Sequence, residues 1–321
     1  MSLTNEKITI MYNKMVTARL LEEMLHEMFS EHMLHGTTHL GIGQEASGIG
    51  ACMTLRDGDK ATLTHRNHVQ CIGLGMNVKY LLAEMFGKET GTNSGLGGSM
   101  HLMDLKNGNL GANGIVGGGL GLALGAAFKM HYHKEENVVM CFLGDGATNE
   151  GLFHEALNLA SIKNLPVVFF VENNHYAVSM NTSRSMKVTD IGQRANAYGI
   201  RSIILDGNDA IDVYNMTFSA VQYVREGNGP ILIESKTYRV AGHSKSDVKQ
   251  LYRSQEEVDA WVAKDPIKRL EEYILKNNIA NSEMLKEINT RVMDEIREAV
   301  LFAQNSLDPS ADILNKHIYA K

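Results

Sequence analysis

The stretch from residue 138 to residue 176 constrains the fold of this chain most strongly. Two apolar runs, residues 138–143 and 167–171, end at Gly-Asp-Gly and at Glu-Asn-Asn. Short apolar runs bounded by turn-forming residues predict buried parallel strands. Apolar residues at helical spacing lie between the two runs: Leu152, Phe153, Ala156, Leu159 and Ala160. The stretch therefore predicts a strand–helix–strand unit whose helix begins at about Thr148.

Polar side chains follow both predicted strands at the point where each strand ends. Asp145 follows the first strand, and Asn173 and Asn174 follow the second. In open α/β sheets this edge binds ligands, and carboxylate and carboxamide oxygens suit magnesium shared with phosphate. The glycines beside Asp145 and the start of the next helix favour a nearby phosphate. A magnesium–diphosphate site is one interpretation. A plain turn followed by a helix cap is the other, and the local pattern leaves both open.

Composition limits the class of protein. With 321 residues and 44% hydrophobic content, the chain can form one large domain or two smaller ones. A net charge of −6 argues against nucleic-acid binding, which needs a basic face. The three cysteines are far apart, and neither a signal pattern nor an apolar run of about 18 residues is present. We therefore expect a soluble, cytoplasmic protein that does not bind membranes.

The rest of the chain predicts a single α/β domain, residues 1–321, with a mostly parallel sheet flanked by helices. We expect an N-terminal helix over about residues 5–34, a turn at His35-Gly36 and a helical C-terminal tail over about residues 255–321. Short strands are predicted near residues 61–64, 202–205 and 230–234, and a helix over residues 209–225. The glycine-rich segment 91–121 and the polar segment 237–254 are expected to be irregular, the latter a mobile loop.

The spacing of the central motif resembles a known family. Twenty-six residues, 147–172, separate Gly146 from Asn173, and Gly-Asp-Gly with about this interval to Asn-Asn is the thiamine diphosphate fingerprint. Other segments also resemble the alpha subunits of thiamine diphosphate-dependent 2-oxo acid dehydrogenase components: HLGIGQEA, THRNH, GGSMH, ANGIVGGG, ENNHYAVS, DGND and TYRVAGHSKSD. The resemblance covers about residues 8–310, and the acetoin dehydrogenase branch is the nearest. It implies a fold that binds the diphosphate half of the cofactor.

The resemblance implies a ligand set for magnesium and for the diphosphate. Asp145 and Asn174 would coordinate Mg²⁺ through their side chains, and Tyr176 through its backbone carbonyl. Gly146 and Ala147 would offer backbone amides to the diphosphate.

Four further residues are implied to bind the cofactor. His65 and Arg66 would reach phosphate oxygens, although many relatives have tyrosine at the position of His65. This departure puts the role of His65 in doubt but leaves that of Arg66, whose planar fork suits phosphate. Gly114 and Val116 would contact the aminopyrimidine through backbone groups.

Two histidines are implied to act at the reacting centre. His243, on the polar loop, would approach both the diphosphate and the reacting atoms, and His39 would line the substrate pocket. Ser244 and Ser246 lie where some relatives are phosphorylated, a regulation that we do not expect in this bacterial-looking branch.

Two other interpretations are less favoured by the sequence. His65 and His68 have the spacing of a metal pair, but no third ligand follows at a suitable distance. Gly119, Gly121 and Gly125 resemble a dinucleotide fingerprint, but no strand is predicted before them and no acidic residue follows at the right distance. Relatives often have proline at Gly121 and a basic residue at Leu96, which leaves the local loop geometry open.

The resemblance also implies partners. Activation of the cofactor needs a buried glutamate, and no second sheet domain that could carry it fits within 321 residues. A beta subunit would supply this glutamate in a heterotetramer of two alpha and two beta subunits. The expected reaction is cleavage of acetoin to acetaldehyde, with oxidative transfer of the two-carbon unit to a lipoyl-bearing acyltransferase. The alternatives are the alpha subunit of a pyruvate dehydrogenase and a non-catalytic scaffold.

Overall fold

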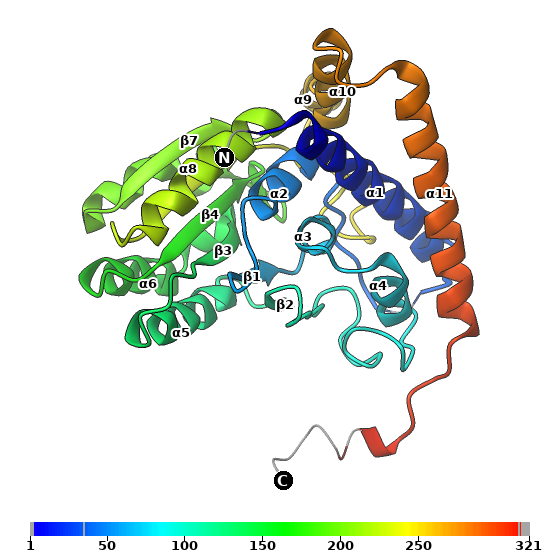
Figure 1. Cartoon of the computed structure of the whole chain (residues 1–321), viewed down its shortest axis with the longest axis horizontal. Helices are drawn as coiled ribbons and strands as arrows, with labels where there is room; N and C mark the ends of the chain where they lie inside the picture. The colour runs from blue at the N-terminus through cyan, green and yellow to red at the C-terminus, as the bar shows by residue number, and fades with distance from the viewer. Residues whose placement is uncertain (1–2, 35, 314, 316–321) are drawn as a thin grey trace.

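The computed structural model of the chain describes residues 3–34, 36–313 and 315. Its central sheet has six parallel strands in the order β2-β1-β3-β4-β8-β7 (Figure 1). The strands are β1 (Lys60–Thr64), β2 (Asn109–Asn113), β3 (Val139–Gly144), β4 (Val167–Asn173), β7 (Arg201–Asp206) and β8 (Ile231–Lys236). Two short antiparallel strands, β5 (Tyr176–Ala177) and β6 (Met180–Asn181), form a separate hairpin. The prediction of a mostly parallel α/β fold is therefore confirmed.

Helices cover both faces of the sheet, which explains why its central strands are apolar throughout. Phe142 and Phe170 face the side of α8 (Ala210–Arg225) and α2 (Glu45–Cys52). Cys141 and Phe169 face the side of α5 (Gly118–Tyr132) and α6 (Gly151–Ile162). Figure 1 shows α8 on one side of the sheet and α5 and α6 on the other. Strands buried on both faces cannot alternate apolar with polar residues.

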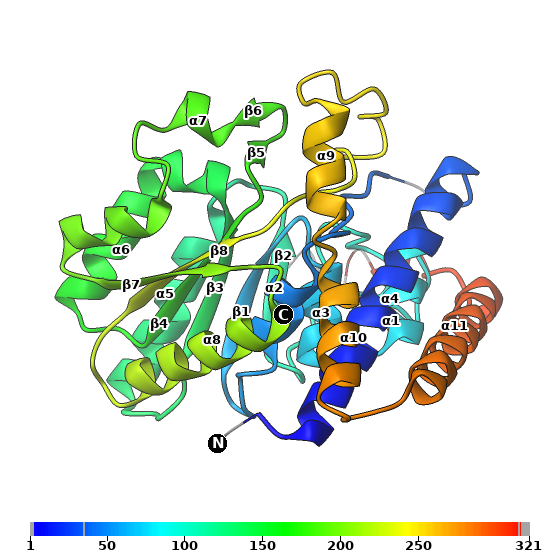
Figure 2. The same ribbon diagram turned by 90° about the horizontal axis from the view of Figure 1, so that it is seen from above.

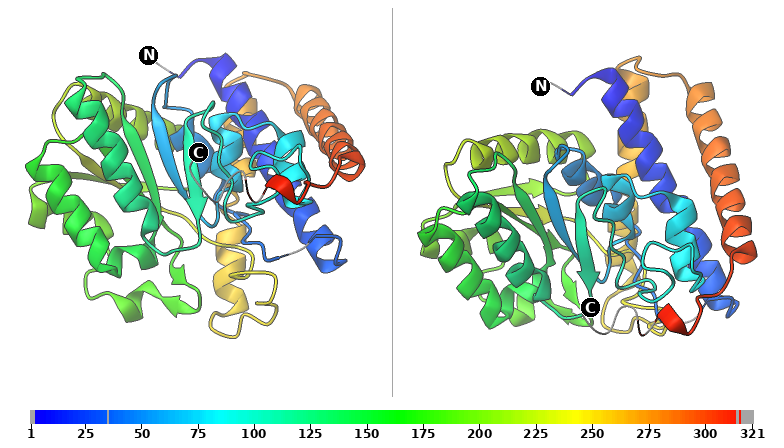
Figure 3. Two further views of the ribbon diagram at one scale, coloured as in Figure 1. Left: turned by 90° about the horizontal axis from the view of Figure 1, so that it is seen from below. Right: turned by 60° about the horizontal axis from the view of Figure 1, so that its bottom comes forward.

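A second group of helices extends the core beyond one side of the sheet (Figure 2). It comprises α1 (Asn5–Ser30), α3 (His68–Leu74), α4 (Val78–Met85), α9 (Gln255–Val262), α10 (Pro266–Lys276) and α11 (Ser282–Asn305). In the described part of the predicted C-terminal tail the named helices are α9, α10 and α11, and α11 packs along α1 and α4 (Figure 3). Residues 314 and 316–321 of that tail lie outside the described residues, as does His35 of the predicted turn. No helix in the described part of the chain is long and apolar enough to cross a membrane.

Three boundaries differ from those predicted. The first helix ends at Ser30 rather than near residue 34, and His32 adopts a φ of 59°. The helix after Asp145 does not begin at Thr148, because Asp145–Asn149 forms a 3-10 turn and α6 starts only at Gly151. The glycine-rich segment 91–121 is not irregular throughout, since it contains β2 and the start of α5.

A buried ion pair ties together the end of the sheet opposite the ligand-binding edge. The carboxylate of Asp59 accepts hydrogen bonds from Arg225 at 3.0 and 2.7 Å, one on each oxygen. It also accepts the backbone N–H groups of Arg56 and Val138. The side chains of Asp59 and Arg225 are only 0% and 9% exposed. One carboxylate therefore joins the starts of β1 and β3 to the end of α8.

We predict that Asp59→Ala lowers the free energy of unfolding by about 3 kcal/mol, because it leaves the Arg225 charge buried without a partner. Urea unfolding followed by circular dichroism measures the change. Arg291→Ala is the control: its ion pair with Glu295 is exposed, so we expect a change below about 0.5 kcal/mol. A loss at Asp59 no larger than that at Arg291 would show that the ion pair contributes little.

Candidate functional site

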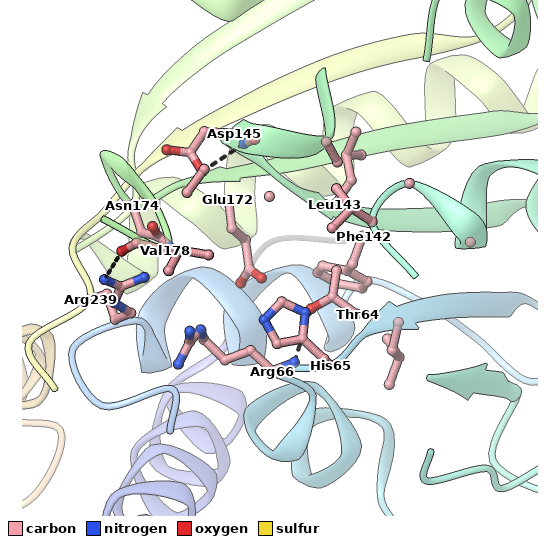
Figure 4. Close-up of a pocket in the computed structure, with 18 of the residues that line it drawn as sticks. Thr64, His65, Arg66, Phe142, Leu143, Asp145, Glu172, Asn174, Val178 and Arg239 are labelled. Atoms are coloured by element: carbon pink, nitrogen blue, oxygen red, sulfur yellow. Dashed lines mark hydrogen bonds between the residues drawn. The ribbon is translucent and has the colours of Figure 1, made fainter. Parts of the chain in front are cut away.

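A cavity opens at the carboxyl ends of β1, β3 and β4 (Figure 4). The chain leaves β1 for β2 on one side and returns to β3 on the other, so the strand order reverses between β1 and β3. Such a reversal creates a crevice in a parallel sheet, and ligands bind there. The loops after these strands, the β5 hairpin and the segment after β8 all contribute to the lining.

The structure brings together most of the residues that the sequence singled out. Nine of the eleven line this one cavity: His65, Arg66, Val116, Asp145, Gly146, Ala147, Asn174, Tyr176 and His243. Gly114 and His39 are not among the lining residues. His39 lies behind the lining, with its ring centroid 4.5 Å from that of His65 and 4.8 Å from that of His243.

Asp145 is a buried carboxylate with one oxygen unused. Its side chain follows β3 directly, and the residue is 2% exposed. Oδ1 accepts the N–H of Gly146 at 2.9 Å, whereas Oδ2 is buried and has no hydrogen-bond partner among the described residues. Burial raises the pKa of Asp145 to about 6, against the lowering effect of the Gly146 amide and Arg239. A carboxylate oxygen in this state is stabilised by a bound cation.

Asn174 lies on the same rim as Asp145 (Figure 4), and Tyr176, two residues further along the chain, also lines the cavity. The side-chain amide of Asn174 donates to Oε1 of Gln44 at 3.1 Å, and its oxygen accepts the N–H of Tyr176 at 3.3 Å. The carbonyl of Tyr176 accepts one hydrogen bond from Arg239 at 3.2 Å. Because an amide oxygen has two lone pairs, each of these oxygens can still accept a further ligand. The three oxygens are therefore compatible with a hard cation.

Gly146 is required by packing on the β5 hairpin. A Cβ atom at this position would lie 2.6 Å from Cβ of Ala177, which is closer than real contacts allow. The sequence suggested that a glycine here lets a phosphate approach the backbone. Packing against Ala177 is a second reason for glycine at this position.

Two buried guanidinium groups line the cavity: Arg66 lies across from Asp145, and Arg239 lies beside Asn174 (Figure 4). Arg66 is 7% exposed and donates to the backbone carbonyls of Leu40 and His243. Arg239 is 1% exposed, and its Nη2 donates to the carbonyl of Val178 at 2.7 Å. Its Nε has no partner among the described residues. These two charges make the interior of the cavity strongly positive.

Three imidazoles cluster beside the guanidinium groups. Ring nitrogens of His39, His65 and His243 lie within 4.8 Å of one another, a spacing that would suit a transition metal. Burial, followed by the charge of Arg66, lowers their pKa values to about 3, 2 and 4 respectively, so all three rings are neutral at pH 7. The nearby guanidinium charges oppose a cation here and favour an anion with hydrogen-bond acceptors. The cavity thus combines a rim of oxygen atoms that suits a cation, which we call the cation rim, with buried positive charges that favour an anion.

Comparison with known proteins accounts for this arrangement. Residues 13–312 match the family model described as the dehydrogenase E1 component. The chain belongs to this family. It is a component of a thiamine diphosphate-dependent oxidoreductase.

Three relatives illustrate the range of the E1 family. The chain is 44% identical to the alpha subunit of acetoin:2,6-dichlorophenolindophenol oxidoreductase from Bacillus subtilis, over 99% of this chain and 95% of the relative. It is 39% identical to the pyruvate dehydrogenase E1 component subunit alpha of Porphyra purpurea, over 99% and 94%. The corresponding subunit of Rickettsia prowazekii is 40% identical, over 96% and 94%.

The sequence did not reveal every lining residue of this E1 component. Glu172 at the end of β4 is 4% exposed and points into the cavity toward Arg66 (Figure 4). Burial raises its pKa to about 7, although Gln70 donates to both of its oxygens at 2.8 Å. Gln44 also lines the cavity, with a buried Nε2 that has no partner among the described residues. The position of Glu172 just before Asn173 was a usable signal, whereas Gln44 reaches the site only through tertiary packing.

The structure bears on both of the less favoured interpretations, the metal pair and the dinucleotide fingerprint. His65 and His68 do not form a metal pair, because His68 is fully buried and contacts Glu22 and Ser99 instead. The prediction that no strand precedes the glycine-rich stretch is wrong, since β2 ends at Asn113 shortly before α5 begins. Gly121 and Gly125 nevertheless lie outside the cavity lining, and a Cβ atom at either position would meet open space.

The buried carboxylate of Asp145 predicts a pH-dependent effect on stability. Its pKa is about 6 in the folded chain and near its ordinary value of 3.8 when unfolded. Because the pKa is raised in the folded state, the ionised carboxylate destabilises that state at high pH. The destabilisation disappears as the pH falls from about 6 toward 4. We expect Asp145→Asn to raise the free energy of unfolding of the cofactor-free chain by roughly 2 to 3 kcal/mol at pH 7.5, and by almost nothing at pH 4.

Urea unfolding at both pH values measures this difference. Asp190→Asn is the control, since Asp190 is exposed and paired with Lys236, and its removal should give no gain. Equal stability of Asp145→Asn and the parent chain at pH 7.5 would contradict the burial argument.

Proposed function

We propose that the chain is the alpha subunit of an acetoin dehydrogenase that holds the magnesium and diphosphate end of thiamine diphosphate. In this proposal the enzyme cleaves acetoin to acetaldehyde and passes the two-carbon unit oxidatively to a lipoyl-carrying acyltransferase, or to an artificial dye. The observation that carries the cofactor site is the buried Asp145, whose Oδ2 has no partner among the described residues, in the same cavity as two buried guanidinium groups. The 44% identity with the Bacillus subtilis acetoin oxidoreductase subunit supports the substrate.

The cation rim would hold Mg²⁺ through Asp145, Asn174 and the carbonyl of Tyr176. Mg²⁺ favours oxygen ligands of this kind and is commonly shared with phosphate oxygens. Gln44 would support the site by fixing the orientation of the Asn174 amide, so that its oxygen, rather than its nitrogen, faces the ion. Arg239 would orient the Tyr176 carbonyl in the same way.

The diphosphate would lie between the cation rim and the histidine rings. Ala147 would offer its backbone amide at the start of the 3-10 turn, whereas the amide of Gly146 already donates to Asp145 and would reach a phosphate only by sharing its hydrogen. The neutral rings of His65 and His243 can each donate one N–H. Both Nη atoms of Arg66 already donate to backbone carbonyls, so its contribution would be its charge and the positioning of the loop that carries His243. Gly114 and Val116 would present backbone groups to the aminopyrimidine.

Thiamine diphosphate, when bound, supplies an electron sink for breaking a bond next to a carbonyl group. The chain's own contribution at the reacting end is a set of neutral hydrogen-bonding groups. Their low pKa values keep the rings of His39 and His243 uncharged at neutral pH, so His243 would orient the substrate by hydrogen bonds, with His39 packed behind the lining. Leu63, Phe142 and Leu143 line the floor of the cavity and exclude water from it.

A beta subunit would complete the site. The carboxylates that line the cavity, among the described residues, are Asp145 and Glu172. Asp145 faces the cation rim, and both oxygens of Glu172 are held by Gln70, so neither is placed to activate the aminopyrimidine. We therefore infer that the activating glutamate comes from a beta chain, in a heterotetramer of two alpha and two beta subunits. Exposed Ile115, at 76%, lies on the cavity side and offers apolar surface to that partner.

Pyruvate dehydrogenase is the second candidate, because relatives with that name are 39% and 40% identical over nearly the whole chain. Its alpha subunit would use the same residues to decarboxylate pyruvate. A non-catalytic scaffold is opposed by the presence of Asp145, Asn174 and Arg66 together in one cavity.

The test is to reconstitute the chain with its beta subunit, thiamine diphosphate and Mg²⁺, and to follow dye reduction. We expect kcat/KM for acetoin to exceed that for pyruvate by at least about tenfold. Turnover of pyruvate without turnover of acetoin would establish the second candidate. Thermal denaturation is the parallel measurement, made on the chain with and without the beta subunit. If the cofactor and Mg²⁺ raise Tm in neither case, and neither acetoin nor pyruvate is turned over, the scaffold interpretation is correct.

A further inference from the structure

A fully buried histidine outside the cavity joins three segments of the chain. His68 begins α3, and both His68 and Glu22 of α1 are 0% exposed. Nδ1 of His68 lies 3.2 Å from Oε1 of Glu22, and Nε2 lies 3.0 Å from the hydroxyl of Ser99. A carboxylate can only accept, which makes Nδ1 the donor to Glu22, and the hydroxyl of Ser99 in turn donates to Oγ1 of Thr38. Both ring nitrogens are thus engaged, and the ring cannot turn without losing a buried hydrogen bond.

The same contacts reach the side chain of Thr38 and the backbone of Gly41, which lie on either side of His39 in the sequence. Oγ of Ser99 lies 3.4 Å from Oγ1 of Thr38, and Oε1 of Glu22 accepts the N–H of Gly41 at 2.9 Å. A Cβ atom on Gly41 would lie 2.8 Å from the side chain of Val69 and 3.3 Å from Glu22, so the backbone packs directly against these residues. The residues that flank His39 are therefore fixed by Glu22 and, through Ser99, by His68.

Few contacts hold the side chain of His39 in place. It is 7% exposed, and its Nδ1 has no hydrogen-bond partner among the described residues. Its ring touches the rings of His65 and His243 edge-on, contacts that allow small shifts. Its position beside the cavity consequently depends on its backbone, and so on Thr38 and Gly41.

The Ser99–His68–Glu22 arrangement resembles a hydrolytic triad, but its surroundings exclude that use. Ser99 is 7% exposed and is not among the residues that line the cavity. The amides of Gly97 and Gly98, which could otherwise stabilise an oxyanion, donate to Glu84 at 2.7 and 3.1 Å. A nucleophile needs both access and oxyanion stabilisation. The arrangement therefore has a positioning role and no nucleophilic one.

We propose that Glu22, His68, Ser99 and Thr38 form a positioning relay that sets the imidazole of His39 against His65 and His243 at the reacting end of the cavity. The relay residues do not touch the substrate and act only through His39. The kinetic test rests on the proposed function, because it needs a substrate that turns over. A spectroscopic test on the isolated chain does not.

The spectroscopic test uses the chain with ¹⁵N-labelled histidine rings. We expect the His68 ring signals to show a proton on Nδ1, as the contact with Glu22 requires. Thr38→Val, which removes the hydroxyl and keeps the shape, should shift the ring signals of His39, assigned with His39→Gln. His68→Asn and His68→Gln should each shift His39 as well, since the first can retain only the Glu22 contact and the second only the Ser99 contact. Thr217→Val is the control, because Thr217 is buried on α8 and its hydroxyl has no partner among the described residues.

The kinetic test is a double-mutant cycle in the reconstituted enzyme. We expect Thr38→Val to lower kcat/KM by about tenfold, because a small misplacement of a group at a reacting centre is costly. The rise in Tm on adding thiamine diphosphate and Mg²⁺ should stay unchanged. In the His39→Gln background the same substitution should have almost no further effect. Thr217→Val should leave kcat/KM unaltered in both backgrounds.

The outcomes separate the relay from the proposed function. If neither acetoin nor pyruvate is turned over by the parent enzyme, the proposed function fails, and the ring signals alone decide the relay. If Thr38→Val leaves the His39 signals in place, or lowers kcat/KM equally with and without His39, the relay is refuted. If the relay variants lower Tm but leave the His39 signals and the kinetics unchanged, these contacts have only a structural role, and the relay is likewise refuted.

Discussion

The burial of the Asp145 carboxylate is the constraint on which the site depends. A charged oxygen without a partner is costly inside a protein, and burial raises the pKa of Asp145 to about 6. The fold keeps the group there because β3 ends directly before it, at the point where the strand order reverses. The charges of Arg66 and Arg239 are also buried, at a cost, in the same cavity. A metal ion with its diphosphate would neutralise both kinds of charge together, which explains why one cavity collects such unfavourable charges.

The central unit could be predicted from the sequence because its signals are local. Residues 138–143 and 167–171 are apolar throughout, as strands covered on both faces must be, and the turns after them carry Asp145 and Asn174. The interval between the two motifs then indicated the family, which the match over residues 13–312 confirms. The metal and diphosphate roles of the individual residues stay predictions.

Other features depend on long-range packing and left no local signal. Gln44 reaches Asn174 across 130 positions of sequence, and Glu22 meets His68 across 46. Five-residue β2 was missed because its glycine and two asparagines are typical of turns, and only pairing with β1 makes it a strand. His39 was expected in the lining, but it lies behind His65 because its neighbours Thr38 and Gly41 are held by other segments.

The central claim is that Asp145, Asn174 and Tyr176 bind the metal of a metal–diphosphate cofactor. The most direct test is a crystal structure of the chain with thiamine diphosphate and Mn²⁺ in place of Mg²⁺, with Mn²⁺ located by anomalous scattering. The account predicts a peak within about 2.0 to 2.3 Å of the Asp145 carboxylate, the Asn174 amide oxygen and the Tyr176 carbonyl. A peak among His39, His65 and His243, with none at Asp145, would contradict it.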